Sequence, residues 1–340
     1  MKILFIGGTG TISMAITRLL AAQGHELYLL NRGHRNAGLP ENVQIIACDI
    51  NNEAEAAEKI AGMAFDCVGE FIGFVPQQLE RDYRLFADKT KQFIYISSAS
   101  AYQKPPKGFR ITEETPLENP YWEYSRNKQA CEEYLMARYR EDGFPVTIVR
   151  PSHTYDERAV PLGVHGDQGS WQVVSRIRDG RPVIIHGDGT SLWTITHNSD
   201  FAKAYVGLIG NPAAIGEAFH ITSDESVTWN EIYQAIADAL GAELHPFYVS
   251  SGTLATMSRY DFTGSLLGDK ANSVQFDNSK VKKLVPDFKA EISAKEGIAR
   301  TVQYVLRHPE YQIADDVFDK WCDDVIAAVK AMREGFRNSH

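Results

Sequence analysis

Short apolar runs alternate with longer amphipathic segments through the first half of the chain. Apolar runs without polar alternation are typical of strands buried on both faces of a parallel sheet. The pattern predicts strands at the start of residues 2–13 and at 25–30, 43–47, 65–68, 92–96 and 146–149. It predicts helices at 12–20, 53–61, 76–89 and from about 120 to 141. This alternation favours an α/β fold with a Rossmann-like, doubly wound parallel sheet.

The order of elements becomes irregular after residue 155, as expected where a chain leaves its sheet to build a second lobe. Helices are predicted at 168–179, 199–209, 294–306 and 315–334, and strands at 183–186, 192–196 and 219–222. Thr228 and Glu231 form a capping-box pattern before an apolar periodicity that ends at Gly241. We expect one domain from residues 1–154 and 198–222 and a smaller C-terminal lobe from residues 155–197 and 223–340.

A glycine-rich turn directly follows the first predicted strand and precedes an apolar helix pattern. Glycines permit a tight turn and a close approach of backbone to ligand, and a helix N-terminus attracts an anion. Strand, turn and helix in this order predict a dinucleotide site, with a purely structural turn as the alternative. We expect four residues here to contact the cofactor: Gly7, Gly10, Thr11 and Ile12. Ser13 stands where a third glycine usually allows close packing of helix on strand.

The end of the second predicted strand indicates which nicotinamide cofactor binds. An acidic residue at this position bonds the ribose 2′-hydroxyl, whereas an arginine accommodates a 2′-phosphate. The chain has Asn31 and Arg32 here, with Arg35 close by and no Asp or Glu. This favours NADP(H), with NAD(H) as the alternative, unless the arginines only form a solvated basic turn. After the third strand, Asp49 is placed to touch the adenine or to cap the next helix, with Ile50 beside it.

Candidate acid/base chemistry follows the fifth predicted strand. Ser98, Ser100 and Tyr102 lie in the loop at its carboxyl end, the edge where open α/β sheets bind ligands. Tyr124 and Lys128 follow on the next long helix and share one face, because they are four residues apart. A nearby ammonium favours the phenolate and lowers the pKa of the phenol, which makes Tyr124 a usable acid or base. Ser98 can donate to the same substrate oxygen.

These motifs in this order resemble a known superfamily. The glycine turn, Ser98 at a strand end and Tyr124-x-x-x-Lys128 are similar to the short-chain dehydrogenases/reductases. The chain length and the Arg-Pro pair ending at Pro151 resemble the extended branch, the NAD(P)-dependent epimerases and dehydratases. The resemblance implies that Tyr124 moves a proton, that Lys128 binds the nicotinamide ribose and that Ser98 orients the substrate oxygen. It also implies cofactor contacts from Pro151 and His153, although His153 is equally well a structural hydrogen-bond donor.

The resemblance further implies an oxidoreductase or epimerase that acts on a hydroxyl or ketone of a sugar or nucleotide sugar. Relatives pair as homodimers through the helices that correspond to residues 76–89 and 122–141, so we expect a homodimer. Sugar dehydratases of this branch carry an acid directly after the serine, and the chain has none after Ser98, which disfavours dehydration.

Several residues are candidates for contact with the substrate. We expect contacts from Ser98, Ser100, Tyr102, His153 and Trp171. Other aromatic residues that line a cleft or, more often, fill a core are Trp193, Tyr248, Tyr260 and Phe262.

Composition argues against several other classes of function. The formal net charge of −9 opposes general attraction to nucleic acid. The four cysteines lie far apart and the histidines show no ligand-like spacing, so we expect neither disulfides nor a metal. No apolar run suggests a membrane span or a secretory signal, and we expect a cytoplasmic protein.

Two segments also resemble the branch that includes the chloroplast stem-loop-binding proteins. They are the Asn-Arg-Gly sequence starting at Asn31 and residues 65–70. The alternative function is therefore an RNA-binding protein, or an NADP(H) sensor, on the same fold without turnover. Ser98, Tyr124 and Lys128 would have no role in such a protein, which favours the enzyme.

Overall fold

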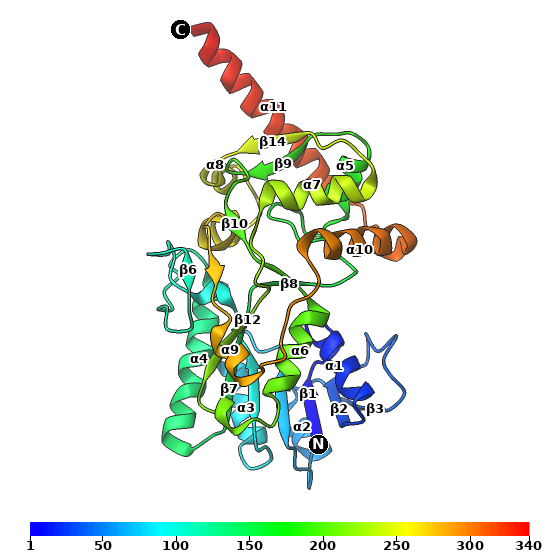
Figure 1. Ribbon diagram of the computed structural model, residues 1–340, viewed down its shortest axis with the longest axis vertical. Coiled ribbons are helices and arrows are strands. Elements are labelled where there is room, and N and C mark those ends of the chain that lie inside the picture. The colour runs from blue at the N-terminus through cyan, green and yellow to red at the C-terminus, as the bar shows by residue number, and fades with distance from the viewer. Residues whose placement is uncertain (340) are drawn as a thin grey trace.

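The computed structural model describes residues 1–339 as a sheet domain with a smaller lobe stacked on one end of it (Figure 1). Seven parallel strands form the sheet, in the order β12-β7-β5-β4-β1-β2-β3. Their bounds are β1 (Lys2–Ile6), β2 (Glu26–Asn31), β3 (Val43–Ala47), β4 (Cys67–Glu70), β5 (Phe93–Ile96), β7 (Val146–Pro151) and β12 (Ala218–Ile221). The strand order reverses at β1 and β4, which confirms the predicted doubly wound, Rossmann-like sheet.

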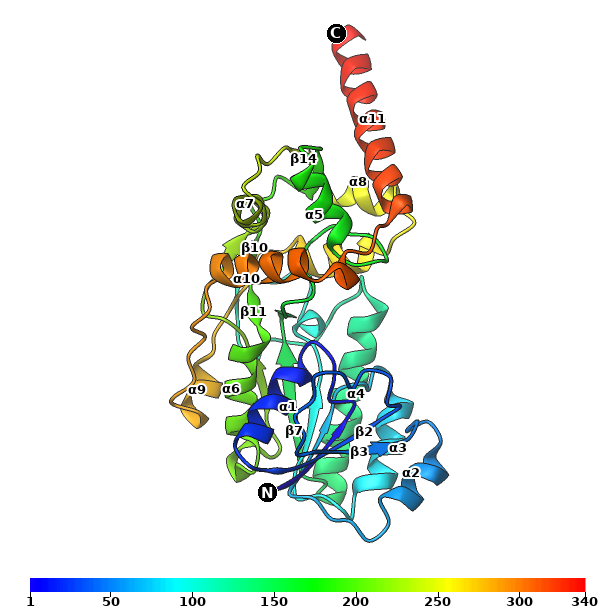
Figure 2. The same ribbon diagram turned by 90° about the vertical axis from the view of Figure 1, so that its right-hand side faces the viewer.

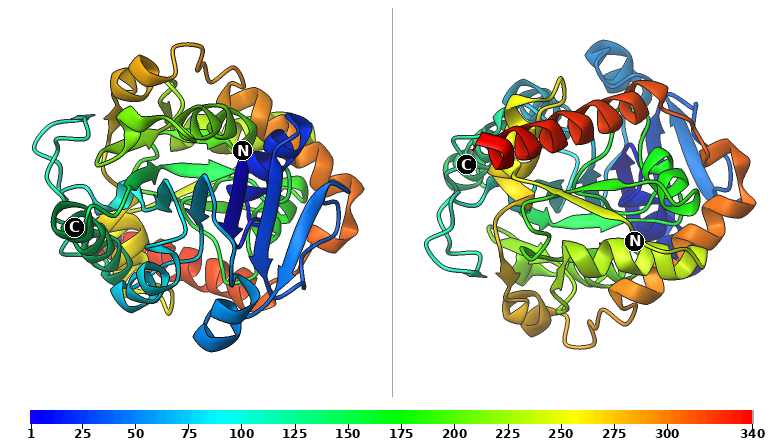
Figure 3. Two further views of the ribbon diagram at one scale, coloured as in Figure 1. Left: turned by 90° about the horizontal axis from the view of Figure 1, so that it is seen from below. Right: turned by 90° about the horizontal axis from the view of Figure 1, so that it is seen from above.

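Helices cover both faces of the sheet, as the view from below shows (Figure 3). One face carries α1 (Ser13–Ala22) and α6 (Asn198–Leu208). The other carries α2 (Glu53–Lys59), α3 (Pro76–Phe86) and α4 (Glu123–Asp142). Because both faces are buried, successive residues of one strand enter opposite cores: Ile3 packs with α1 and α6, and Leu4 packs with α2 and α3.

The smaller lobe surrounds its own hydrophobic core. Its helices are α5 (Trp171–Arg178), α7 (Trp229–Leu240), α8 (Ser251–Thr256), α10 (Ala294–Arg307) and α11 (Asp316–Ser339). Paired short strands are β8 (His153–Tyr155) with β11 (Ile195–His197), β9 (Val183–His186) with β14 (Pro246–Val249), β10 (Leu192–Trp193) with β13 (Val227–Thr228), and β6 (Arg110–Ile111) with β15 (Gln275–Phe276). The 3₁₀ helices η1 (Ala99–Ala101), η2 (Pro212–Ala214) and η4 (Pro309–Tyr311) and the π-helix η3 (Thr263–Lys270) complete the fold.

Local signals in the lobe have the predicted effect at α7. The Thr228 side chain accepts a hydrogen bond from the backbone N–H of Glu231, and the Glu231 carboxylate accepts one from the backbone N–H of Thr228. Gly241 ends the helix with φ at +65°, a left-handed conformation that favours glycine. The predicted strand 192–196 is instead divided into β10 and β11, because the two halves pair with different partners.

The C-terminal segments do not all belong to the lobe. After β15, helix α9 (Ser279–Leu284) returns to the sheet domain, where Val281 and Phe288 join the core beside α6. The final helix α11 packs on the lobe through its first half and projects away from it in two perpendicular views (Figure 1, Figure 2). No helix in residues 1–339 is long and apolar enough to cross a membrane.

Candidate active site

The glycine turn forms an open anion site at the start of α1. Gly7 and Gly8 have φ values of +101° and +90°, which other residues rarely adopt. Helix α1 begins without a side-chain cap and without an acid in its first turn, so its N–H groups stay available to a ligand. The Ser13 hydroxyl accepts a hydrogen bond from the N–H of Gly10 at 2.9 Å, so this serine fits the position of the third glycine. The turn therefore suits a pyrophosphate.

A cavity of about 450 Å³ extends from this turn over the ends of β2 and β3, and we call it the glycine-turn cavity. Its lining includes seven of the predicted cofactor residues: Gly7, Gly10, Asn31, Arg32, Arg35, Asp49 and Ile50. Arg32 and Arg35 are exposed, and no acidic side chain in residues 1–339 pairs with either guanidinium. Asn52, not Asp49, caps α2, so the structure excludes the capping role considered for Asp49.

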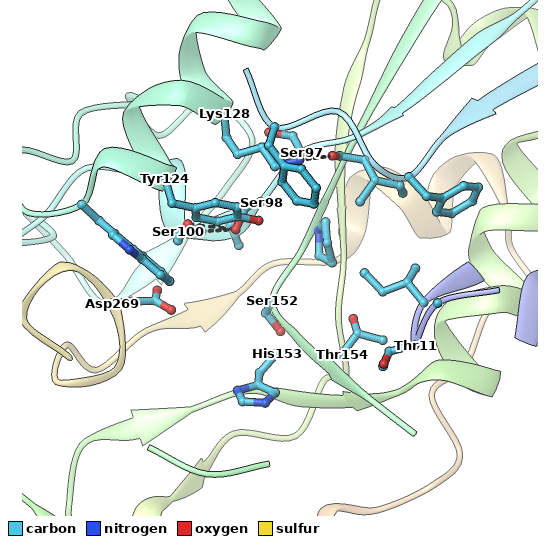
Figure 4. Close-up of a pocket in the computed structure, with 18 of the residues that line it drawn as sticks. Thr11, Ser97, Ser98, Ser100, Tyr124, Lys128, Ser152, His153, Thr154 and Asp269 are labelled. Carbon is cyan, nitrogen blue, oxygen red and sulfur yellow. Dashed lines mark hydrogen bonds between the residues drawn. The ribbon is translucent and has the colours of Figure 1, made fainter. Parts of the chain in front are cut away.

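A second cavity of about 450 Å³ lies where the sheet meets the lobe, and we call it the central cavity (Figure 4). It continues from the glycine-turn cavity, because Gly10, Ser13, Phe71 and Phe74 line both. It brings together eight further predicted site residues: Thr11, Ile12, Ser98, Ser100, Tyr124, Lys128, Pro151 and His153. The two cavities form one elongated site with the glycine turn near its middle.

Ser98 is held in place by a relay of hydroxyl groups. Its Oγ lies 2.9 Å from Oγ of Ser100, to which the Ser125 hydroxyl donates at 2.8 Å. The Ser98 side chain also accepts from the backbone N–H of Ser100 and so starts η1. Ser98 is half-buried and faces the cavity, whereas Ser100 and Ser125 are buried behind it.

Tyr124 reaches the same region from the first turn of α4 (Figure 4). Burial raises the pKa of its phenol, and the Ser98 hydroxyl partly opposes this by hydrogen bonding. The negative charge of Asp269 also raises the pKa of Tyr124. The shift is opposite to the lowered pKa that the sequence predicts, so the Tyr124 side chain is a phenol and a proton donor at neutral pH.

Lys128 accounts for this difference. Its ammonium donates to the backbone carbonyls of Gly73 and Ile96, at 2.7 and 2.8 Å, and lies 5.8 Å from the centre of the Tyr124 ring. Its charge is therefore directed at the protein backbone rather than at the phenol oxygen. Burial lowers the pKa of Lys128 to about 8, so the side chain remains mostly charged at pH 7.

His153 lies across the cavity on β8, beside Ser152 and Thr154 (Figure 4). Burial lowers the pKa of its imidazole to about 3, and the positive charge of Lys270 adds to the shift. The imidazole is therefore neutral over the physiological range and offers one donor and one acceptor. Both the cofactor and the substrate assignments of His153 stay predictions.

Two of the expected substrate residues lie outside both cavities. Tyr102 is 1% exposed, and its hydroxyl bonds Arg150 and His220 in the core between the sheet and the lobe. Trp171 is buried at the start of α5 beside Arg178. Both side chains instead pack in the hydrophobic core of the lobe. Of the other aromatic candidates, Trp193 lines the central cavity.

The central cavity also contains residues that sequence reasoning missed. They are Phe71, Phe74, Trp122, Asp269, Lys270 and Phe276. Phe71 and Phe74 follow β4 at the carboxyl edge of the sheet, so the rule that located Ser98 could have located them. Asp269 and Lys270 come from a π-helix some 140 residues beyond Tyr124, and no local pattern indicates their position.

Three residues that line the central cavity each have a buried polar side-chain atom without a hydrogen-bond partner in residues 1–339. The atoms are Oγ of Ser97, Oγ1 of Thr154 and Nε1 of Trp193. A buried polar group without a partner is costly, so these atoms indicate a polar ligand. Within the same residues, no three His, Cys, Asp or Glu side chains gather as a metal site, and all four cysteines are buried and free.

The open sheet, the glycine turn and the Ser98, Tyr124 and Lys128 set together define an extended short-chain dehydrogenase/reductase. The model of the NAD dependent epimerase/dehydratase family matches residues 3–222, more than half of the chain. The chain belongs to this family of enzymes.

Three similar proteins are a reductase, a binding protein and an epimerase. A 2′-dehydrokanamycin reductase from Streptomyces kanamyceticus is 26% identical, over 73% of this chain and 69% of that protein. A chloroplast stem-loop binding protein of 41 kDa from Arabidopsis thaliana is 26% identical, over 71% of this chain and 63% of that protein. A UDP-glucose 4-epimerase from Mycolicibacterium smegmatis is also 26% identical, over 63% of this chain and 62% of that protein. The chain thus spans about two thirds of the length of these relatives.

Solved structures share the fold over nearly the whole chain. The epimerase Mth375 from Methanothermobacter thermautotrophicus has a TM-score of 0.72 at 18% identity, covering 91% of this chain and 93% of that one. A UDP-glucuronic acid 4-epimerase from Bacillus cereus, solved with UDP-glucuronic acid and NAD, has the same TM-score and identity and covers 90% and 99%. At these identities the similarity shows the fold.

Proposed function

We propose that this protein is an NADP(H)-dependent oxidoreductase or epimerase that acts on a hydroxyl or ketone of a sugar or nucleotide sugar. The observation that carries the proposal is the convergence of Ser98, Tyr124 and Lys128 on one cavity that continues into the glycine-turn cavity. The unpartnered polar atoms of the cavity and its indole rings suit a hydroxylated ligand with apolar faces. Relatives named reductases and epimerases of sugar compounds support the substrate class.

The residues present fit a nicotinamide dinucleotide. The glycine turn and the N-terminus of α1 would hold the pyrophosphate, and Arg32 with Arg35 would pair with a 2′-phosphate. When bound, a nicotinamide supplies hydride exchange with the substrate carbon. Pro151 and His153 line the part of the cavity that would receive the nicotinamide.

Tyr124 and Ser98 would manage the substrate oxygen. In reduction, the Tyr124 phenol donates its proton to the carbonyl oxygen, and in oxidation the phenolate accepts the proton of the hydroxyl. The Ser98 hydroxyl donates to the same oxygen and is oriented by Ser100. Two of the three Lys128 N–H groups donate to backbone carbonyls, and the third would bind the nicotinamide ribose.

The test is turnover of a panel of sugars and nucleotide sugars with NADPH or NADP⁺, in wild type and Tyr124→Phe. The phenylalanine variant should lose activity by about 10²- to 10⁴-fold, because the ring remains and only the proton donor is lost. The exposed neighbour Tyr121 provides the matched control Tyr121→Phe, which should keep activity. Net consumption of NADPH indicates an oxidoreductase, and an inverted product without net consumption indicates an epimerase. Equal activity in Tyr124→Phe and wild type would contradict the proposal.

The relative named chloroplast stem-loop binding protein supports RNA binding as the second candidate function. Its test is titration of a stem-loop RNA into the purified protein. Saturable RNA binding with no turnover in the panel would favour this candidate. We also propose a homodimer through the neighbouring helices α3 and α4, to be tested by native mass spectrometry.

A further inference from the structure

The central cavity has an excess of positive charge, although the whole chain carries −9. The charged residues that line it are Lys128, Asp269 and Lys270. A third lysine, Lys104, is buried directly behind Asp269, with its side chain 2% exposed. Two of the three N–H groups of Lys128 already donate to backbone carbonyls, so the charge with the most hydrogen-bonding capacity left for a ligand lies at the Asp269 and Lys270 end of the cavity.

The charges at this end are only loosely paired. Asp269 lies 4.0 Å from the ammonium groups of both Lys104 and Lys270, which is beyond hydrogen-bonding distance. Burial raises the pKa of Asp269 and lowers the pKa of Lys270, so each charge lacks adequate compensation. A buried ion pair is favourable only with close geometry and further hydrogen bonds, so these groups have capacity left for a ligand.

The position of Lys270 is fixed by the surrounding fold. Its backbone carbonyl accepts hydrogen bonds from Nε1 of Trp229 at 3.1 Å, Nε2 of His186 at 3.3 Å and Oγ of Ser191 at 3.3 Å. Asn119 ties Gly268, two residues before Lys270, to the serine loop, because its side-chain amide donates to the carbonyls of Gly268 and Ser100 at 2.7 Å each. The π-helix is therefore tied to the loop that carries Ser98 and Ser100.

Two unused donors accompany Asp269 at this end of the cavity. One is the Lys270 ammonium, which lies 4.0 Å from Asp269 and 5.7 Å from the centre of the Trp122 ring. The other is the indole N–H of Trp193, a residue that is 3% exposed. Lys104 lies 6.0 Å from the Trp193 ring and adds a second positive charge behind it. Donors and positive charge together favour an anionic acceptor and disfavour an ammonium.

We propose that Lys270 and Trp193 bind an anionic substituent of the substrate, a carboxylate or a phosphate, beside the carbon whose oxygen faces Tyr124. This inference rests on the proposed function and specifies its substrate class as acidic sugars. Asp269 limits the affinity of the site for the anionic group, because it neutralises part of the charge of Lys104 and Lys270.

Isothermal titration with four probes tests the site without turnover: D-glucuronate, D-glucose 6-phosphate, D-glucose and D-glucosamine. One of the two anionic probes should bind at least about tenfold tighter than glucose, as expected for charge-assisted hydrogen bonds. Glucuronate as the tighter anion indicates a carboxylate, and glucose 6-phosphate indicates a phosphate. Tighter binding of glucosamine, or no saturable binding of either anion, would overturn the proposal.

Substitutions at Lys270 and Asp269 test whether the site prefers a negatively charged ligand. Lys270→Met should weaken the anion about tenfold, whereas the exposed control Lys283→Met should bind as wild type does. Asp269→Asn should tighten the anion several-fold, a result that damage to the fold cannot produce. Weaker binding in Asp269→Asn would contradict the assignment. NADPH binding and Tyr124-dependent turnover without any preference for the anionic probes would refute this inference alone, and the proposed function would stand.

Discussion

Lys128 donates a hydrogen bond to the backbone carbonyl of Gly73, 2.7 Å away, and so ties helix α4 to the loop that follows β4. That loop includes Phe71 and Phe74, which line both cavities. Lys128 therefore also shapes the junction between the glycine-turn cavity and the central cavity. Its two backbone acceptors hold the charge in place before any ligand arrives.

Stability at alkaline pH should report the buried charge of Lys128. Its pKa in the folded protein is about 8, below the ordinary value of 10.5, so between these values the unfolded chain binds more protons than the folded one. The free energy of unfolding should therefore rise with pH across this window by up to about 3 kcal/mol from this residue. Urea unfolding of wild type and Lys128→Met at pH 7.5 and pH 10 measures the difference. A gap between the two proteins that does not change with pH would show that Lys128 is not buried as described.

His186 should have the corresponding effect at acid pH. Burial lowers the pKa of its imidazole to about 4, so the unfolded chain takes up a proton at pH values where the folded protein does not. Stability from this residue is present above the ordinary pKa of 6.5 and falls as the pH decreases towards 4. Relative to His186→Gln, wild type should lose about 2 kcal/mol between pH 7 and pH 5 in denaturant unfolding. Parallel curves for the two proteins would contradict this.

Alanine substitutions at two glycines of the turn should affect stability and cofactor binding separately. A Cβ at Gly8 would lie 2.4 Å from Cδ2 of Leu29, and the φ of Gly8 is positive, so Gly8→Ala should lose more than about 1 kcal/mol of stability. A Cβ at Gly10 would meet only Oγ of Ser13, at 3.6 Å, so Gly10→Ala should fold with wild-type stability. Gly10→Ala should still weaken NADPH, because its methyl group projects where the pyrophosphate is expected. Thermal unfolding and cofactor titration of both variants check this, and wild-type NADPH affinity in Gly10→Ala would exclude the predicted pyrophosphate position.

The sequence was informative wherever a signal was local. The buried strands, the cap at Thr228 and the glycine turn follow from short-range patterns, and these predicted the sheet and the turn that lines the glycine-turn cavity. Spacing alone brought Tyr124 and Lys128 onto one face of α4. The direction of the Lys128 charge was not predictable, because its acceptors lie in two other elements.

The lining of the central cavity depends on long-range packing. Asp269 and Lys270 reach the cavity because the π-helix is tied to Asn119 and Trp229, which are distant in the sequence. Tyr102 follows Ser98 and Ser100 in sequence but turns into the core, where Arg150 and His220 satisfy its hydroxyl. Local hydrophobic periodicity therefore could not predict the positions of these side chains.

The central claim is that the elongated site holds a nicotinamide cofactor with a 2′-phosphate. The most direct measurement is a fluorescence titration of wild type, Arg32→Ala and the exposed control Arg140→Ala with NADPH and NADH. Wild type should prefer NADPH, and Arg32→Ala should weaken NADPH about 10- to 100-fold through the lost phosphate pair, with little effect on NADH. Arg140→Ala should match wild type with both cofactors. Failure of wild type to bind either cofactor would contradict the account of the site as a whole.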